Sequence, residues 1–261
     1  MIHKGGSKMS LYETIYVRRQ VKKFTNTPLD AQTLDAINHF VKNSDQLLGQ
    51  NAQFEIVSVG ETTGGQAPHY LVSFCDDTNA AYANVGYVLQ KADLYIQSMG
   101  LGSSWFAGQR LRNDNKNYAT VLAFGYTDTP KRKNHHEFKR LPVAKISQVD
   151  NKVARAVRLA PSALNSQSWK LEFEEGKVIV VNCERGVRNY FLHDKLHRIN
   201  AGIAARHAVL ALEQEGKKII DIVPRTWGKE FEIIIFYDEY KHGNYNYISS
   251  RVSPQYRKVA G

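Results

Sequence analysis

Residues 80–100, AAYANVGYVLQKADLYIQSMG, and residues 199–216, INAGIAARHAVLALEQEG, are the two stretches that decide the fold. Each has the helical recurrence of apolar positions and then a glycine, which predicts long amphipathic helices over Ala80–Met99 and Ile199–Gln214 with glycine caps. The motif Asn84-Val85-Gly86 recurs as Asn200-Ala201-Gly202, and because 84 and 200 differ by 116, the offset is 116 residues. The closing glycines, at 100 and 216, also differ by 116.

The repeat extends upstream of both helices. Residues 50–55, QNAQFE, align with residues 167–172, QSWKLE, at an offset of 117, and a single insertion reconciles the two offsets. A strand, a helix and its cap in the same order predict an internal duplication, and two copies indicate a pseudo-dimer rather than a solenoid. We expect a flexible lead-in at 1–10, related halves at 11–142 and 143–238, and a C-terminal extension at 239–261.

The remaining elements follow from local patterns. Shorter helices are predicted at Leu11–Arg19, Thr33–Val41 and Val149–Leu159. Strands are predicted at Phe54–Val59, Tyr70–Phe74, Tyr118–Tyr126, Lys170–Phe173, Val178–Asn182 and Glu230–Tyr237. This order predicts an α+β fold with long core helices and a mixed β-sheet.

Composition narrows the class of protein. A hydrophobic content of 43% with 23% charged residues is typical of a folded chain, and no apolar run reaches the roughly 18 residues of a membrane span. The first residues lack the apolar segment of a secretory signal. The two cysteines, Cys75 and Cys183, form no CxxC motif, so we expect a reducing, cytoplasmic location.

The net charge of +10 calls for an anionic partner. The cations gather in short clusters at Arg18–Lys23, Lys131–Lys133 and Lys139–Arg140. A nucleic-acid-binding protein more often has a continuous basic stripe interleaved with aromatic residues. We therefore expect a small phosphorylated ligand and no nucleic acid.

Three motifs could carry chemistry. Residues 17–24, VRRQVKKF, place four cations in six positions and suit a phosphate, although a solvated basic helix end would look the same. Residues 160–169, APSALNSQSW, offer hydroxyl and amide groups to a planar ring, or else a helix cap followed by a core tryptophan. Residues 99–108, MGLGSSWFAG, could let the backbone approach a ligand, but they form no dinucleotide-binding GxGxxG.

Two histidines, His193 and His197, have the i,i+4 spacing of metal ligands on a helix. No HExxH motif and no third ligand accompany them. We expect no metal site. No Ser/His/Asp order indicates a hydrolase.

Taken together, the three motifs resemble the FMN-dependent nitroreductase family, whose members carry RRSxR, GLGxxW and PSxxNxQPW motifs and a basic RxP segment. Here that segment is residues 140–142, RLP, and the strand before it ends in Gly125-Tyr126. Residues 67–70, APHY, are similar to the AP motif that precedes a strand of the family. The resemblance covers residues 11–237.

The resemblance implies a fused, two-unit member that binds one FMN per chain. Ordinary members are homodimers in which RRSxR of one chain meets PSxxN of the other, whereas each half of this chain retains one of these motifs. The mirror-image site, at Leu48 and Ala52, is therefore expected to be empty. The implied FMN contacts come from both halves: Arg18, Arg19, Gln20, Lys22, Gly102, Ser103, Arg140, Pro161, Ser162 and Asn165.

Arg18 and Arg19 would face the phosphate and the ribityl chain, and Arg140 would be a second phosphate cation. Lys22 would lie near the N1 edge of the ring. Gln20 replaces the serine of the family, and Ser168 replaces its proline. The implied activity is hydride transfer from NADH or NADPH through flavin N5 to a small acceptor such as a nitroaromatic or a quinone, with ping-pong kinetics and no catalytic side chain. Alternatives are another flavin reaction, such as dehalogenation or flavin modification, and a degenerate flavin-binding protein. We expect a monomer or a weak homodimer.

Overall fold

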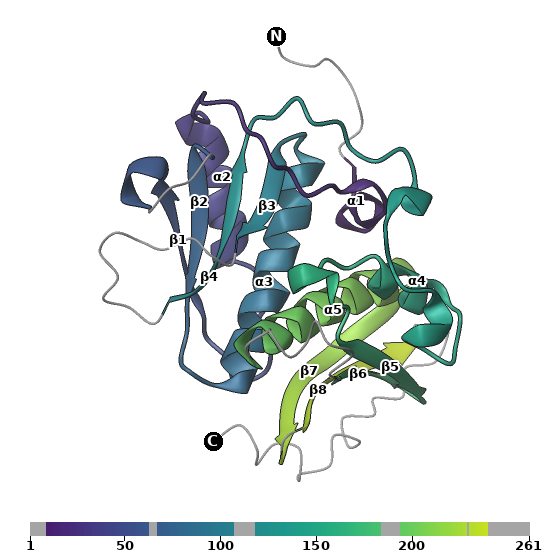
Figure 1. The fold of residues 1–261 in the computed structure, drawn as a ribbon. Coiled ribbons are helices and arrows are strands. Elements are labelled where there is room, and N and C mark those ends of the chain that lie inside the picture. Colours follow the sequence, from purple (N-terminus) through teal and green to yellow (C-terminus); the bar gives the residue numbers. More distant parts are fainter. Residues whose placement is uncertain (1–8, 63–66, 107–117, 184–193, 229, 240–261) are drawn as a thin grey trace.

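The computed structural model describes residues 9–62, 67–106, 118–183, 194–228 and 230–239 (Figure 1). Within them the helices are α1 (Leu11–Val17), α2 (Ala31–Lys42), α3 (Asn79–Ser98), α4 (Lys152–Arg158) and α5 (Asp194–Gln214). The strands of the first sheet are β1 (Gln53–Ser58), β2 (His69–Phe74), β3 (Gly102–Phe106) and β4 (Tyr118–Gly125). Those of the second are β5 (Trp169–Glu174), β6 (Lys177–Asn182), β7 (Lys217–Trp227) and β8 (Glu230–Glu239).

Local sequence signals set the ends of the helices. Ser10 caps α1 through a capping box with Glu13, and Asp30 caps α2. The helix α3 begins at the N-cap Thr78 and ends before Gly100, which has a φ of 86°. That left-handed backbone suits glycine, so the predicted glycine cap is confirmed.

The two sheets have the same strand order, β1-β2-β4-β3 and β5-β6-β8-β7. All of the neighbouring strands named here pair antiparallel. The α+β class is confirmed, but the predicted mixed sheet is wrong, because among the described residues parallel pairing is limited to the isolated bridges Gln20–Ser103 and Ser147–Leu171. The short hairpin connections between β5 and β6 and between β7 and β8 favour antiparallel neighbours.

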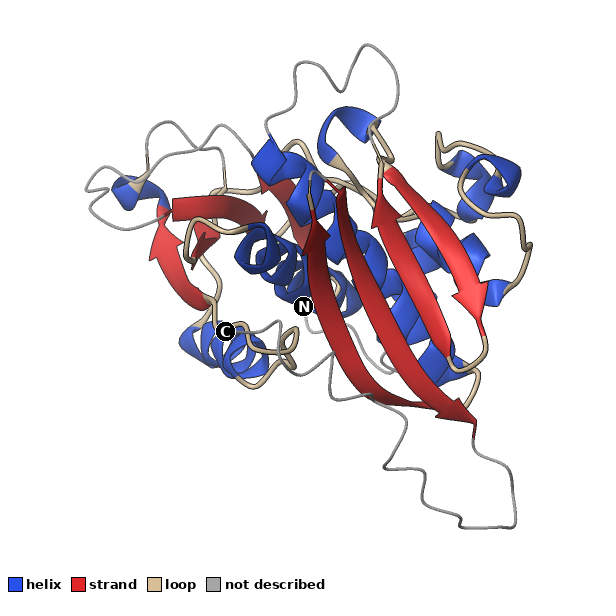
Figure 2. Ribbon diagram, turned by 90° about the horizontal axis from the view of Figure 1, so that it is seen from below, coloured by secondary structure: helices blue, strands red, loops and turns tan. Residues whose placement is uncertain are grey.

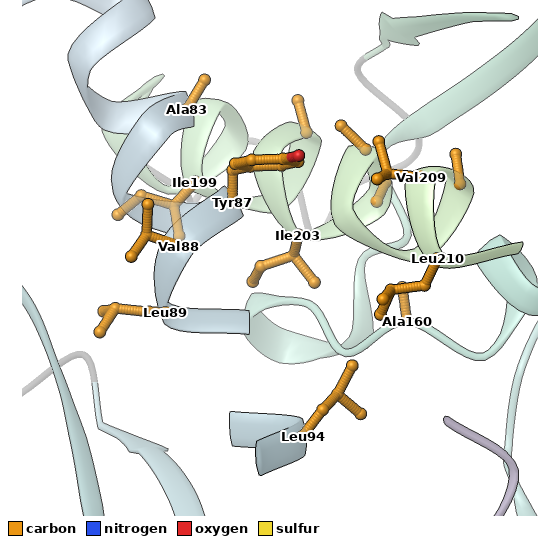
Figure 3. Close-up of a cluster of buried hydrophobic side chains, with 14 of the residues drawn as sticks. Ala83, Tyr87, Val88, Leu89, Leu94, Ala160, Ile199, Ile203, Val209 and Leu210 are labelled. Atoms are coloured by element: carbon orange, nitrogen blue, oxygen red, sulfur yellow. The ribbon is translucent and has the colours of Figure 1, made fainter. Parts of the chain in front are cut away.

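The helices α3 and α5 lie between the sheets and cross each other (Figures 1 and 2). Their closest approach is at two glycines: a Cβ on Gly86 would collide with the Ile199 carbonyl, and one on Gly202 would collide with the Ala83 carbonyl. The contact is reciprocal, since 83 and 199, like 86 and 202, differ by 116. Side chains such as Tyr87 fill the surrounding core (Figure 3).

A single hydrophobic cluster joins both long helices and the inner faces of both sheets. A smaller cluster covers the other face of the first sheet, with Tyr70 and Val72 at its centre. Among the helices that the structure describes, none is both long and apolar enough to cross a membrane.

Candidate anion-binding site at the end of helix α1

The first predicted motif begins where α1 ends. Arg18 adopts φ −56° and ψ 145°, an extended backbone that stops the helix and turns its side chain inward. The guanidinium is 2% exposed, and its Nε donates to Asp93 Oδ2 at 2.8 Å. Its Nη2 is buried without a hydrogen-bond partner in the described structure. A buried guanidinium therefore retains a free donor, which is costly unless a ligand accepts from it.

Arg19 lies beside it and is also incompletely satisfied. Its backbone N–H donates to Gln97 Oε1 at 2.9 Å, and its Nη2 donates to Glu137 Oε2 at 2.7 Å. Its Nε is buried and has no partner among the described residues. Both arginines of the motif thus present one donor beyond those that the protein uses.

A buried polar network centred on Asp93 holds the side chain of Arg18 in place. Asp93, which is 0% exposed, accepts from the Ser103 hydroxyl at 2.5 Å and from the side-chain amides of Gln97 at 3.1 Å and Gln90 at 3.2 Å. These donors stabilise the carboxylate, which in turn fixes the guanidinium of Arg18. Asp93 was not predicted, although Gln90, Asp93 and Gln97 form a polar stripe on an otherwise apolar helix that could have revealed it.

The network extends to α5 through His207. Its Nδ1 lies 2.9 Å from the Ala156 carbonyl oxygen and its Nε2 lies 3.1 Å from the Gln90 amide nitrogen. Burial lowers the pKa of His207 to about 3, and the positive charges of Arg18 and Arg140 add to the shift. The imidazole is therefore neutral near pH 7.

The second motif meets the first through Arg140. Its Nε donates to the Ala160 carbonyl at 3.0 Å and its Nη1 donates to Asn165 Oδ1 at 2.6 Å. The Asn165 amide nitrogen donates to the Lys139 carbonyl at 3.0 Å. The structure thus joins the basic segment before residue 142 to the polar turn after α4.

The polar turn has an unusual backbone. Leu164, Asn165 and Gln167 have φ values of 53°, 55° and 49°, in the left-handed region. Ser162 Oγ accepts from the Gln167 N–H at 2.9 Å and closes the turn, while Pro161 is buried behind it. Three non-glycine residues in this region within four positions store strain, and such strain concentrates at functional sites.

The guanidiniums lie close enough to repel one another. Burial lowers the pKa of Arg140 to about 9, and the positive charges of Arg18, Arg132 and Arg158 contribute. The pKa of Arg132 falls to about 10 for the same reasons, with Arg18 and Arg19 as neighbours. Sequence reasoning counted Arg132 within the basic cluster Lys131–Lys133 but gave it no role, because it belongs to none of the three motifs.

The other predicted residues are placed as follows. Gln20 and Lys22 are exposed. Gly102 packs against protein, since a Cβ there would lie 2.7 Å from a methyl of Thr127 and 2.8 Å from one of Val21. Ser103 is fully buried. The third motif is therefore mostly strand β3, and its glycine at 102 is needed for packing; Gly108 lies outside the described residues.

The histidine pair cannot be placed as a pair, because His193 lies outside the described residues. His197 is buried and its Nδ1 lies 3.1 Å from Ser168 Oγ. No group of three metal-ligating side chains occurs in the described part of the chain. Most of the predicted lead-in, 1–10, and of the predicted extension, 239–261, also lies outside the described residues, which include only 9, 10 and 239 of these segments.

Comparison with known proteins identifies the family of the chain. A family model described as "Putative TM nitroreductase" matches residues 10–212. The fold is similar to that of a putative nitroreductase from Thermotoga maritima, with 21% identity, a TM-score of 0.65, and coverage of 90% of this chain and 97% of that one. A search of curated proteins finds no match.

Two further solved structures align with about half of the chain. An FMN-dependent nitroreductase from Clostridium difficile has 18% identity and a TM-score of 0.37 over 47% of this chain and 91% of that one. A nitroreductase with bound FMN from Desulfitobacterium hafniense has 14% identity and a TM-score of 0.37 over 51% of this chain and 100% of that one. The family match spans most of the sequence, and the chain belongs to this nitroreductase family.

Proposed function

We propose that the chain is an FMN-dependent oxidoreductase that passes a hydride from NADH or NADPH to a small acceptor such as a nitroaromatic or a quinone. The observation that carries the proposal is the contact of Arg140 with Asn165 beside the buried, incompletely satisfied Arg18. Arginine donors fit a phosphate dianion, and the side chains of Asn165 and Ser162 fit a polyhydroxylated chain. This donor set matches FMN.

Each predicted residue then has a role toward the cofactor. Arg18, Arg19 and Arg140 hold the phosphate, while Pro161, Ser162 and Asn165 line the ribityl chain and ring. Gln20, Gly102 and Ser103 are neighbours in the same region. Gly102 and Ser103 would approach the cofactor through their backbone, since the side chain of Ser103 donates a hydrogen bond to Asp93.

The protein's contribution to the reaction is orientation and charge. When bound, FMN supplies the hydride-transfer chemistry. The exposed ammonium of Lys22 can approach the N1 edge of the ring and stabilise negative charge there. Solvent can deliver the proton, so no side chain need act as a general acid. One site used in turn by donor and acceptor gives ping-pong kinetics.

We also propose that the two halves, 11–142 and 143–238, arose by duplication and form an internal pseudo-dimer with one FMN per chain. The identical strand orders and the reciprocal contacts of Gly86 and Gly202 support this. So do two matching hydrogen bonds: Asn84 Oδ1 accepts from the Leu47 N–H at 2.9 Å, and Asn200 Oδ1 accepts from the Ala163 N–H at 3.0 Å.

Further expectations concern assembly and location. A chain that already contains both halves need not dimerise to complete its site, so we expect a monomer or a weak homodimer. Cys75 and Cys183 are both free thiols, and burial raises the pKa of Cys75 to about 11. These features support the cytoplasmic location.

The direct test is a flavin titration of the purified protein. We expect one FMN per chain by fluorescence quenching, and anaerobic bleaching of the bound flavin by NADH or NADPH. A protein that stays colourless after FMN is added would overturn the proposal. A yellow protein that neither nucleotide bleaches would instead support a flavin-binding protein without this activity.

Two variants test the shared site. Arg18→Ala and Asn165→Ala should each weaken FMN binding about tenfold or more, because each removes a hydrogen-bonding partner of a charged group. Arg155→Ala, which removes an exposed arginine paired with Asp150, is the control. Unchanged FMN affinity in both test variants would mean that the site does not join the two motifs.

A further inference from the structure

A guanidinium outside all three sequence motifs is held beside Arg18. The N–H of Arg132 donates to the Val17 carbonyl at 2.8 Å, at the last residue of α1. Its Nη1 donates to the Arg18 carbonyl, and its guanidinium carbon lies 4.1 Å from the centroid of the Phe138 ring. These contacts fix both the backbone and the side chain of Arg132, so its charge is directed rather than freely solvated.

The same aromatic ring also orients Arg140. Phe138 is 4% exposed, and the guanidinium carbon of Arg140 lies 5.7 Å from its centroid. Guanidiniums stack readily on aromatic faces, which leaves their N–H edges available to an anion. Phe138 therefore brings Arg132 and Arg140 together at one ring, and the positive charge of Arg18 acts on both.

The carboxylates of this region leave two guanidiniums without an ion pair, although Glu137 acts on Arg132 from a longer distance and opposes the lowering of its pKa by burial. Asp93 pairs with Arg18 and Glu137 pairs with Arg19. In the described part of the chain, neither Arg132 nor Arg140 has a carboxylate oxygen within the 4.0 Å of an ion pair. Partly buried like charges without counter-charges are unfavourable, and the lowered pKa values of both arginines reflect this.

We propose that Arg132 is a further ligand of the phosphate in this site, and that Arg132 and Arg140 together select a phosphomonoester dianion over its uncharged, dephosphorylated form. A phosphomonoester carries nearly two negative charges at pH 7, which matches the two guanidiniums that have no ion pair. This inference rests on the proposed function, for which it names the charge state that the site recognises.

The test compares FMN with riboflavin, which differ by the phosphate, in Arg132→Gln and in wild type. Loss of one charged donor should weaken FMN binding roughly 10- to 100-fold and leave riboflavin binding within about twofold. Lys133→Gln removes an adjacent, exposed charge and should change FMN binding less than about threefold. Fluorescence quenching gives both dissociation constants without any turnover.

Two outcomes would overturn the inference. The first is an FMN affinity in Arg132→Gln equal to that of wild type. The second is an equal loss for FMN and riboflavin, which would make Arg132 a structural residue. The unliganded variant adds a second readout: with one repelling charge removed, its melting temperature should equal or exceed that of wild type, whereas a structural role would lower it.

A third arm separates this inference from the proposed function. Inorganic phosphate should raise the melting temperature of wild type, and this rise should shrink in Arg132→Gln and in Arg140→Gln. If wild type binds no flavin but shows this pattern, the anion site stands and the proposed function fails. If wild type binds FMN and Arg132→Gln binds it equally well, the proposed function stands and this inference fails.

Discussion

The α3–α5 pair carries two clusters built around a buried arginine, and they differ in how completely the arginine is satisfied. At one, Arg206 is 1% exposed and its Nε, Nη1 and Nη2 donate to the Tyr87 carbonyl, the Asp45 carboxylate and the Asp45 carbonyl. At the other, Arg18 keeps a free buried donor. Burial and charge are alike, so the satisfaction of the guanidinium donors is what distinguishes the two clusters.

Backbone carbonyls explain the difference, because each arginine pairs with a carboxylate but only Arg206 also donates to the Tyr87 and Asp45 carbonyls. Asp45 accepts from the Tyr87 hydroxyl at 2.5 Å, from Lys91 at 2.6 Å and from Arg206 at 3.0 Å. The three donors of Arg206 thus have acceptors within the protein, whereas Arg18 Nη2 has none among the described residues. Near this cluster, the Leu48 N–H donates to the carbonyl of Ile222 in strand β7 at 2.9 Å. The expectation that the mirror-image site at Leu48 and Ala52 is empty stays a prediction.

The largest expected effect comes from breaking the helix crossing on which both clusters depend. Gly86→Ala and Gly202→Ala should each cost about 3 kcal/mol or more, because the new methyl meets a carbonyl of the other helix. Gly60→Ala, where no atom lies within 4 Å of the added carbon, is the control. Urea unfolding measures all three. A large cost at only one of the two crossing glycines would show that the contact is not reciprocal in energy.

Removing the carboxylate that pairs with Arg206 should have the second-largest effect on stability. Asp45→Asn leaves Arg206 buried without its carboxylate and should lower the free energy of unfolding by about 2–3 kcal/mol, less than for a fully buried pair because Asp45 is partly exposed. Asp150→Asn breaks the exposed pair with Arg155 and should cost under about 0.5 kcal/mol. Similar losses in the two variants would mean that Asp45 contributes no more to stability than a carboxylate in an exposed ion pair.

Unfolding measured over a range of pH tests the buried network that links Arg18 to His207 through Asp93 and Gln90. The pKa of His207 falls from 6.5 to about 3 in the folded protein, so between these values the unfolded chain binds more protons and acid destabilises the fold. This histidine should account for up to about 2 kcal/mol of lost stability at pH 5 relative to pH 7. His207→Asn should remove that part of the loss. A pH dependence in His207→Asn equal to that of wild type would show that His207 does not carry this part of the loss.

The smallest effect concerns the strained turn. Leu164 is 61% exposed with a φ of 53°, so Leu164→Gly relieves backbone strain and loses little burial. We expect a gain of about 0.5–1 kcal/mol, whereas Leu164→Ala keeps the Cβ and should gain nothing. Thermal melting of the two variants side by side measures the difference. A loss of stability in the glycine variant would mean that the turn is not strained.

Most of the fold could be predicted because helix periodicity and caps are local signals. β3 was missed, since residues Gly102, Ser103 and Ser104 have low strand propensity and form a strand only through pairing with β4. β7 was also missed: it contains Pro224, which an edge strand tolerates. The parallel component of the sheet was wrong because strand direction depends on connections that periodicity does not report.

The site was predictable only in part. The arginines of the first motif and Asn165 stood out by type and spacing, and the structure brings them to one region. Arg132 carries no such signal, because its proximity to Arg18 arises from a hydrogen bond to the end of α1 far earlier in the chain. Pairing within a cluster, such as that of Asp93 with Arg18, is a tertiary property that a single sequence does not reveal.

The connection from β4 to α4 carries both Arg132 and Arg140, and it is also the covalent link between the two sheets (Figure 1). In a homodimer, a site built at the interface is lost on dilution by mass action. Here the two contributing segments belong to one polypeptide, and their effective concentration is set by that link. The cluster of Arg18, Arg132 and Arg140 should therefore remain assembled at nanomolar protein concentrations, at which a weakly associating dimer would have dissociated.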